Sequence, residues 1–363
     1  MDQGQWQTAE RHFHFYLSST EKLNQLEPEN SEWLIELSYA HNNLGSLSLK
    51  TGQLDDADQS FSESILLKRH AISARTLEHP NIHQLQAELA DSLSWLGSLK
   101  LRQGLLLDGL ALYQEELTII QEIVSKRSHE KLWLNRQAIA HLHQAELLYA
   151  LGRGKEAKHQ IDQATSIMAS LVEAQPDQRV WQRTYAYALV WQYRIESGFN
   201  GNANNSGNLI LAKRIAESLL TIDASRVNWI RLHANIQSML AKSMAMTSSK
   251  QAIAYAQAAY QELVQRSQLD NSDHTTLELL ANILLIQAEI ENKVGNEDSK
   301  QELCHQVLSL TQNVRNSRDY HLLEPIRQAH QCLSQLNEAE VITKQLDQIG
   351  YLAPAFINHH HTN

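Results

Sequence analysis

Residues 43–64 read NLGSLSLKTGQLDDADQSFSES, and residues 95–116 read WLGSLKLRQGLLLDGLALYQEE. Both segments contain a Leu-Gly pair, ending at Gly45 and Gly97, which is followed by the same three residue types. A glycine comes seven residues later, a small residue after twelve and an aromatic residue after sixteen. Self-similarity of this kind is the signature of a repeat architecture, in which each unit contacts only its neighbours. We therefore predict a chain built from tandem repeats.

Weaker copies of the pattern continue towards the C-terminus. Gly152, Ala157 and Ile161 repeat the glycine, the small residue and an apolar residue in phase. Gly198 and Gly295 are expected to supply the same turn in later copies. A tryptophan that recurs about every 48 residues is an independent marker, at Trp133, Trp181 and Trp229. We take the repeat period to be about 48 residues.

The composition favours helices. The 363 residues include only 13 Gly and 5 Pro, whereas the helix formers Leu, Ala, Gln and Glu are abundant. The few helix breakers therefore mark boundaries between helices. We predict an all-α fold of tandem antiparallel helix pairs. The expected pairs are 31–78, 82–128, 131–174, 178–222, 226–267, 274–315 and 319–349.

The N-terminal residues 1–28 are expected to hold one isolated helix, over about 5–26. Gly4, Ala9 and Phe13 match the second-helix part of the pattern, and the matching first helix is missing. An uncovered half-repeat exposes an apolar face, which repeat arrays avoid by capping. This helix is therefore either part of a repeat that begins further upstream or an N-terminal cap.

The repeat array itself is expected to span 29–350, as about seven helix pairs. Residues 198–207 are rich in Asn and Gly and should form a mobile loop. Residues 351–363 are expected to be a disordered tail.

The repeat pattern resembles that of the tetratricopeptide repeat family, over nearly the whole chain. The family repeat has 34 residues, so this sequence is similar to a variant with longer helices. In such repeats the glycine of the first helix and the small residue of the second let two antiparallel helices approach closely. The aromatic residue, Phe61 or Tyr113 here, fills the space beside them. The resemblance implies an α-solenoid that winds as a right-handed superhelix.

The resemblance also implies a binding surface, because first helices of such repeats line a concave groove that takes an extended peptide or a partner helix. Carried over by position, it gives fourteen partner-binding candidates. They are Tyr39, Asn42, Asn43, Ser46 and Lys50 in the first pair, Asp91, Ser94, Trp95, Ser98 and Arg102 in the second, His143 and Glu146 in the third, and Tyr185 and Gln192 in the fourth.

Two of these candidates have alternative roles. Asn43 resembles the Asn that holds a peptide backbone or terminal carboxylate in some family members, since an amide both donates and accepts hydrogen bonds. The alternative is that it caps or solvates a surface. Trp95 and Arg102 are residue types that dominate binding energies, but Trp95 can instead pack between repeats. The family's carboxylate clamp also needs cations at positions that Lys50 and Arg102 do not occupy.

Charge and hydropathy exclude several classes of partner. The 31 basic and 41 acidic residues give a formal net charge of −10, which does not suit a nucleic-acid surface or an anionic membrane. No apolar run reaches the ~18 residues of a membrane helix, and the N-terminus lacks a signal peptide's features. We expect a protein or peptide partner. The expected location is cytoplasmic, or periplasmic if a membrane anchor lies upstream.

No catalytic, cofactor or metal motif is present in the sequence. Residues 152–156 echo a phosphate loop but lack its Ser or Thr and do not follow a strand. Histidines two positions apart, such as His141 and His143, point in different directions on a helix and cannot share a metal. We therefore expect no enzyme activity, no cofactor and no metal.

The two cysteines, Cys304 and Cys332, each fall in a predicted helix. Two thiols in a chain of this length suggest a reducing compartment, and we expect buried free thiols. A disulfide between neighbouring helices is the alternative.

Two functions follow from these observations. The leading hypothesis is a non-catalytic protein-interaction scaffold. The alternative is the sensor or regulatory C-terminal arm of a larger bacterial signalling protein, such as a kinase, an ATPase or a winged-helix regulator. Residues 39–45, 93–97 and 350–354 resemble helical tails of such proteins. An enzyme is the least favoured interpretation.

Overall fold

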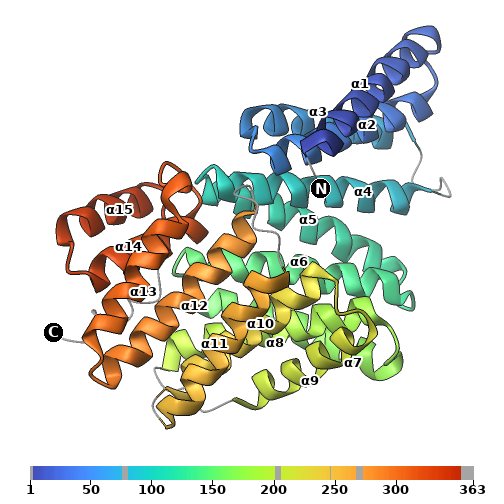
Figure 1. The fold of residues 1–363 in the computed structure, drawn as a ribbon. Helices are drawn as coiled ribbons and strands as arrows, with labels where there is room; N and C mark the ends of the chain where they lie inside the picture. The colour runs from blue at the N-terminus through green and yellow to red at the C-terminus, as the bar shows by residue number, and fades with distance from the viewer. Residues whose placement is uncertain (1–2, 76–80, 201–205, 246, 267–272, 353–363) are drawn as a thin grey trace. The chain divides into compact units, whose positions relative to one another are not determined.

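The computed structural model describes residues 3–75, 81–200, 206–245, 247–266 and 273–352, and every regular element within these ranges is a helix (Figure 1). In chain order the elements are α1 (Gln3–Leu26), α2 (Ser31–Thr51), α3 (Leu54–Ser73), α4 (Ile82–Arg102), α5 (Leu106–Lys126), α6 (Lys131–Ala150), α7 (Gly154–Ala174), α8 (Arg179–Asn200), α9 (Ser206–Ile222), α10 (Val227–Met244), α11 (Ser249–Arg266), α12 (His274–Lys293), α13 (Glu297–Leu310), the 3₁₀ turn Gln312–Val314, α14 (Tyr320–Cys332) and α15 (Leu336–Gln348). The predicted class of all-α antiparallel helix pairs is confirmed. None of the described helices combines the length and apolarity that crossing a lipid bilayer requires.

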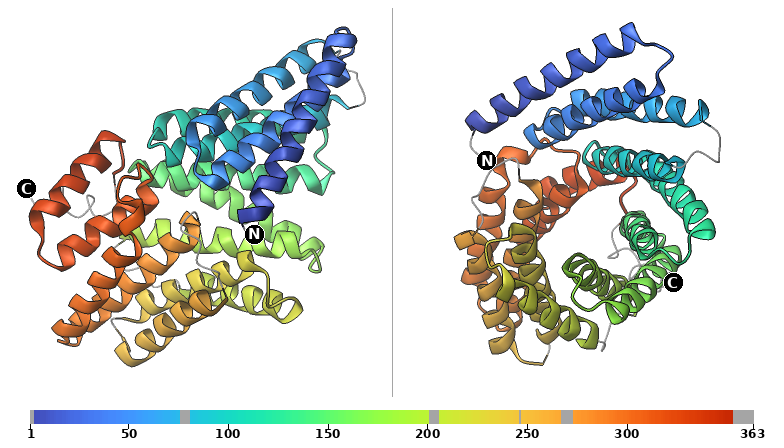
Figure 2. Two further views of the ribbon diagram at one scale, coloured as in Figure 1. Left: turned by 45° about the horizontal axis from the view of Figure 1, so that its top comes forward. Right: turned by 90° about the vertical axis from the view of Figure 1, so that its right-hand side faces the viewer.

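Helices pack in the order in which they follow one another. Within a pair, α2 packs on α3, α4 on α5 and α12 on α13. The second helix of a pair also packs on the first helix of the next pair, as α3 does on α4. Both views in Figure 2 show α1 to α5 succeeding one another in this way. Such nearest-neighbour packing is what a repeat array requires.

The chain divides into two compact units, Met1–His143 and Gln144–Asn363, and α6 runs across the boundary. Each unit has an apolar core of its own. In the N-terminal unit Phe61 of α3 and Leu93 of α4 are completely buried in one cluster. In the C-terminal unit Ile236 of α10 is buried in a cluster that runs from α8 to α12.

The turn inside a helix pair has the same geometry in five pairs. Gly52, Gly104, Gly152 and Gly295 have φ between 69° and 81°, and Ser334 has φ 58° in the last pair. In each turn the next residue's amide N–H donates to the carbonyl oxygen of the residue five positions before it, at 2.8–2.9 Å. This bond satisfies a carbonyl that the helix end leaves open, and the left-handed backbone favours glycine. The four glycine turns were predicted correctly.

The connection between α8 and α9 differs from the sequence-based prediction. Gly198 does not form a turn, because α8 continues through it to Asn200. A glycine inside a helix costs only about 1 kcal/mol, which the rest of α8 tolerates. The segment predicted as a loop over 198–207 is therefore shorter, since α9 already begins at Ser206. Its residues 201–205 lie outside the described part of the chain.

The two residues at the start of the predicted tail pack against the C-terminal unit. The N–H of Leu352 donates to the carbonyl oxygen of Ala150 at 2.8 Å. The ring of Tyr351 stacks on that of Tyr320, with centroids 5.0 Å apart. Residues 353–363 lie outside the described residues.

A close approach between helices fixes the geometry of the first two pairs. A Cβ atom on Gly45 would lie 2.8 Å from Cδ1 of Phe61, and one on Gly97 would lie 2.5 Å from Cε1 of Tyr113. Both aromatic rings are buried, so they have little room to move. The glycine and the aromatic residue sixteen positions later therefore form one contact, as the pattern implied.

Replacing Gly97 by alanine is expected to strain this contact. Overpacking of a well-packed core typically costs 1–3 kcal/mol, and the higher helix propensity of alanine offsets about 1 kcal/mol of this, so the Gly97→Ala variant should lose up to about 2 kcal/mol of unfolding free energy in urea titrations. Ser94→Ala, on the same helix, is the control and should change stability little. A Gly97→Ala variant about 1 kcal/mol more stable than the wild type, as helix propensity alone predicts, would contradict the contact.

A disulfide joins α13 to α14. Cys304 and Cys332 are bonded with their Cα atoms 6.4 Å apart, and neither cysteine is free. The expectation of free thiols is therefore wrong, and the alternative of a disulfide between neighbouring helices holds. The packing of α13 on α14 brings the two positions together, which their spacing in the sequence did not show.

Reduction of this disulfide should destabilise the chain. Closing a loop of 28 residues lowers the entropy of the unfolded state, so reductant should lower the unfolding free energy by about 3 kcal/mol. The Cys304→Ser/Cys332→Ser variant is the control and should not respond to reductant. Identical denaturation curves of the wild type with and without reductant would contradict this expectation.

A buried charge cluster holds α14 against the C-terminal part of α6. His321 Nε2 lies 3.1 Å from a carboxylate oxygen of Glu146, 175 residues away in the chain. Its Nδ1 lies 2.9 Å from a carboxylate oxygen of Asp319, which also faces His274 at 3.5 Å. The cluster thus connects the beginning and the end of the C-terminal unit.

The charges in this cluster change one another's pKa values. Burial by itself would lower the pKa of His321, but the carboxylates of Glu278 and Asp319 raise it well above its usual value. Burial raises the pKa of Glu278, against the opposing effect of His321. The pKa of Asp319 is held below its usual range by His321 and His274 despite its burial. The neighbouring carboxylates therefore favour the protonated form of His321 in the folded chain.

The protonation of His321 gives a pH prediction. A histidine whose pKa is raised by folding stabilises the fold fully below its unfolded pKa of about 6.5, and this contribution is lost as the pH rises through the folded pKa. NMR of the imidazole, assigned by its loss in His321→Gln, should show the protonated ring at pH 7.5 in the native chain and the neutral ring in urea. Titration near pH 6.5 in both states would contradict the prediction.

Candidate functional site

In the N-terminal unit, the partner-binding candidates Tyr39 and Asn42 belong to a polar network between α2 and α4. The hydroxyl of Tyr39 donates to Glu88 at 2.5 Å, and the carboxamide oxygen of Asn42 accepts from Ser92 at 3.2 Å. The ammonium of Lys68, on α3, donates to Ser92 at 2.7 Å. The sequence-predicted Tyr39 and Asn42 are therefore brought together, and each is already paired within the chain.

Lys68 is an unusual member of this network because its side chain is almost completely buried. Its ammonium also lies 5.4 Å from the centre of the Tyr39 ring. Burial lowers the pKa of Lys68 to about 8, against the opposing effect of Glu88 and Asp91. The network thus places a cation directly beneath the α2–α4 surface.

Three further candidates on α2 are open to a partner. Asn43 and Ser46 are half-buried, and the structure gives their side chains no hydrogen bond to any described residue. Lys50 is exposed at the end of α2, with its ammonium 5.9 Å from the centre of the Trp6 ring. Asn43 therefore has both its donors and its acceptor available.

Trp95 combines the two roles that the sequence left open. Its ring stacks on Phe61, with centroids 6.3 Å apart and an interplanar angle of 13°. Even so, 42% of the residue is exposed, which is large for a tryptophan. One face of the indole therefore packs against α3, and the rest of the ring is accessible.

The other α4 candidates make contacts within the unit. Ser94 donates to the carbonyl oxygen of Asp91 at 2.9 Å, and Ser98 lies 3.1 Å from the hydroxyl of Tyr113. The guanidinium of Arg102 donates to the carbonyl oxygen of Leu49 at 2.7 Å. Arg102 thus joins the C-terminal ends of α4 and α2, a structural role that sequence reasoning missed.

The last candidates in this unit are held by neighbouring helices. Asp91 accepts two hydrogen bonds from Arg136 of α6, each 2.9 Å long. His143 lies 3.0 Å from a carboxylate oxygen of Glu116 and stacks on Tyr113, with centroids 4.9 Å apart. These contacts connect α4 and α5 to α6. Asp91 and His143 therefore help to position these helices.

The three candidates in the C-terminal unit have different surroundings. Glu146 belongs to the His321 cluster and accepts a hydrogen bond from Tyr187 at 3.3 Å. Gln192 is paired on both sides, since it donates to Asp162 at 3.0 Å and accepts from Asn208 at 2.9 Å. Tyr185 packs against the apolar core, and burial raises its pKa. Each of the three therefore makes its contacts within the chain.

Several site residues were missed by sequence reasoning. Lys68 and Glu88 complete the network around Tyr39, and His321 and Glu278 complete the cluster around Glu146. Lys68 lies on the α3 face that also buries Phe61 and Ile65. A lysine in such an apolar pattern was a sign, visible in the sequence, of a buried polar contact. His321 gave none, because its partner lies in another repeat.

The α2–α4 surface can offer hydrogen bonds and an aromatic face. It presents an amide, hydroxyl groups, a cation and an exposed indole, a set that suits a peptide backbone or an apolar side chain. Among the described residues, no group of three or more His, Cys, Asp or Glu side chains is arranged to hold a metal ion.

Comparisons with known proteins find likeness in structure rather than in sequence. No protein-family model and no curated protein matches the chain. The apo form of RapI matches with a TM-score of 0.52 at 12% identity, over 84% of this chain and 99% of RapI. A Rap protein complexed with the competence and sporulation factor matches with a TM-score of 0.52 at 14% identity, over 93% of this chain and 85% of that protein.

A third solved structure, BtubC from P. vanneervenii, matches with a TM-score of 0.51 at 15% identity, over 72% of this chain and 92% of BtubC. At such identities the likeness extends to the fold alone. The Rap proteins are repeat proteins of the tetratricopeptide type. In its fold, this chain is therefore a tetratricopeptide-like helical-repeat protein.

Proposed function

We propose that the chain is a non-catalytic scaffold that binds a peptide or a partner helix along the first helices of its N-terminal unit. The proposed surface consists of Asn43, Ser46 and Lys50 on α2 and Trp95 on α4. Tyr39, Asn42, Asp91 and Arg102 lie on the same two helices and are paired within the unit. These eight residues are among the fourteen positions that were expected from the sequence.

The exposed indole of Trp95 is the observation that carries this proposal. A tryptophan with 42% of its surface open, and its inner face fixed on Phe61, loses little conformational freedom when a partner covers it. Tryptophans of this kind are common centres of binding energy. Asn43, with no hydrogen-bond partner among the described residues, can pair with a peptide backbone next to it.

A regulatory arm is the second candidate. The Rap protein of similar fold is complexed with the competence and sporulation factor, so this fold accommodates a bound factor in at least one protein. In the present chain a buried charge cluster holds α14 to α6 through His321. A ligand that altered that cluster would alter a contact between repeats far apart in sequence, as a sensor requires.

The scaffold proposal is tested by comparing what the chain captures from a source-cell lysate. The Asn43→Ala/Trp95→Ala variant should lose the partner that the wild type retains, because truncating a central tryptophan commonly weakens binding by about thirtyfold or more. Arg102 is left intact because its bond to Leu49 supports the fold. Circular dichroism checks that the variant remains helical.

The control is Leu66→Ala/Glu122→Ala, which changes exposed residues on the second helices α3 and α5. This variant should retain the partner at the wild-type level. A partner that is retained equally by all three proteins would place binding elsewhere and contradict the proposal.

A further inference from the structure

A second concave surface lies in the N-terminal unit, formed by α1, α2 and α3. It is a groove of about 630 Å³. Its lining residues recur with the same spacing on α1 and α2, at 10, 14, 17 and 21 and at 37, 41, 44 and 48, and α3 contributes 56, 60 and 63. On α1 and α2 this spacing selects one face of the helix over about three turns, or roughly 16 Å, and on α3 it covers about two turns. The groove is therefore long enough for three turns of a helix.

The groove has an apolar floor. Leu37, Leu44 and Leu47 of α2 line its base, and Leu17 of α1 adds to it from one side. Apolar side chains that face an open groove favour a partner that has an apolar stripe of its own.

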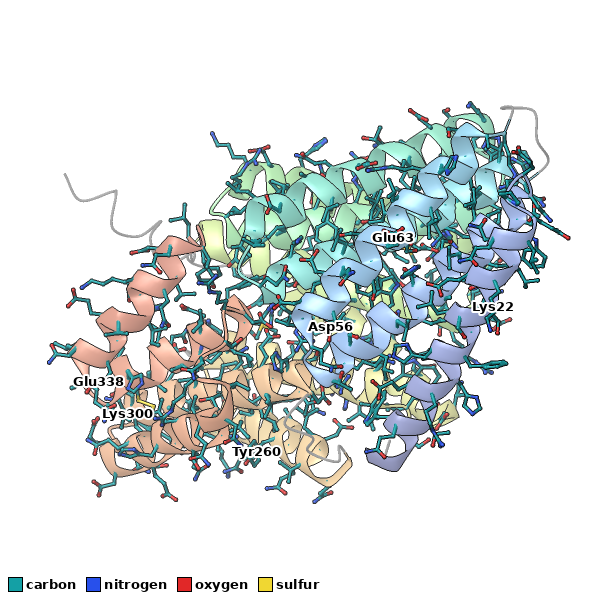
Figure 3. The ribbon with its side chains drawn as sticks, turned by 90° about the horizontal axis from the view of Figure 1, so that it is seen from above. Lys22, Asp56, Glu63, Tyr260, Lys300 and Glu338 are labelled. Carbon is teal, nitrogen blue, oxygen red and sulfur yellow. A yellow bond between two sulfur atoms is a disulfide. The ribbon has the colours of Figure 1, made fainter. Side chains whose placement is uncertain are left out.

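Both walls of the groove are acidic. Glu10 and Glu21 line it from α1, and Asp56 and Glu63 line it from α3. No Lys or Arg is among the described residues that line it, and none of these four carboxylates forms an ion pair with a described residue. Figure 3 labels Asp56 and Glu63 along α3, and it labels Lys22 on α1, which does not line the groove.

His41 lies on the floor between the two walls. Burial lowers its pKa, while Glu63 of α3 and Glu21 of α1 act in the opposite direction. Because the pKa is lowered overall, the imidazole is neutral at pH 7 and does not offset the carboxylates. The two walls are thus close enough for both to act on one ring.

The groove is separate from the surface assigned to the scaffold function. On α2 the groove residues include 41, 44 and 48, whereas the proposed partner surface uses 43, 46 and 50. No residue is in both sets, but Leu47, which also lines the groove, lies one turn from Asn43 and Lys50, so the two surfaces adjoin along α2.

We propose that this groove binds a basic amphipathic helix of about three turns. The apolar stripe of that helix packs on the leucine floor, and its Lys or Arg residues lie along both edges, against the carboxylates of α1 and α3. Charge complementarity selects this occupant, because an acidic or uncharged helix would leave all four carboxylates uncompensated.

The test uses the full chain and a fluorescein-labelled helical peptide of about 14 residues, with leucines in one stripe and lysines along both edges. Fluorescence anisotropy should show at least tenfold tighter binding of this peptide than of a scrambled peptide of the same composition. The Glu21→Gln/Glu63→Gln variant removes one charge from each wall and should weaken binding about five- to tenfold, with a smaller effect at high salt.

The matched control is Glu122→Gln/Glu173→Gln, which changes the net charge equally at exposed carboxylates outside the groove. It should bind the peptide as the wild type does. Equal weakening in both variants, equal binding of the scrambled peptide, or no binding of the amphipathic peptide would each overturn the proposal. Since Asn43 and Trp95 are unchanged in these variants, the result is independent of the scaffold test.

Discussion

The close approach of two helices at Gly45 and Gly97 is the constraint on which the N-terminal unit depends. Because the first helix has no side chain at that point, the aromatic ring of the second helix occupies the space and is itself buried. This contact leaves no room for an additional atom, and it therefore sets the orientation of the two helices of the pair relative to each other. The left-handed turn with its recurring hydrogen bond joins the same two helices about two helical turns away from this contact. Everything that the first helix presents to a partner is positioned by these two features.

One consequence is that α2 serves two surfaces at once. At the contact between the two helices of the pair, α2 has no room for a larger residue than glycine. The α2 residues on either side of this position face different surroundings. Asn43 and Lys50 belong to the proposed partner surface together with Trp95 of α4, whereas Leu37, Leu44 and Leu47 form the floor of the acidic groove. The first surface offers hydrogen bonds and an aromatic face, whereas the second offers apolar area between negative charges.

The sequence allowed the helix pairs and their turns to be predicted because these depend on local patterns. A glycine seven residues after a Leu-Gly pair, and an aromatic residue after sixteen, specify contacts within one repeat. Gly198 misled the prediction because glycine alone does not end a helix when the residues around it favour helix. The pairing of Cys304 with Cys332 and the cluster of Glu146 with His321 depend on contacts between helices that no local pattern records. The candidate surface was predicted by position, but Arg102 could not be recognised as a structural residue until its bond to Leu49 was seen.

The most direct test of the central claim is site-specific photocrosslinking in source-cell lysate. A photoreactive phenylalanine derivative is placed at position 95, on the proposed partner surface of α4, or at position 66, which is exposed on α3. Our account predicts a discrete covalent adduct from position 95 and none from position 66. An adduct that forms only from position 66, or equally from both, would contradict the assignment of partner binding to the first helices.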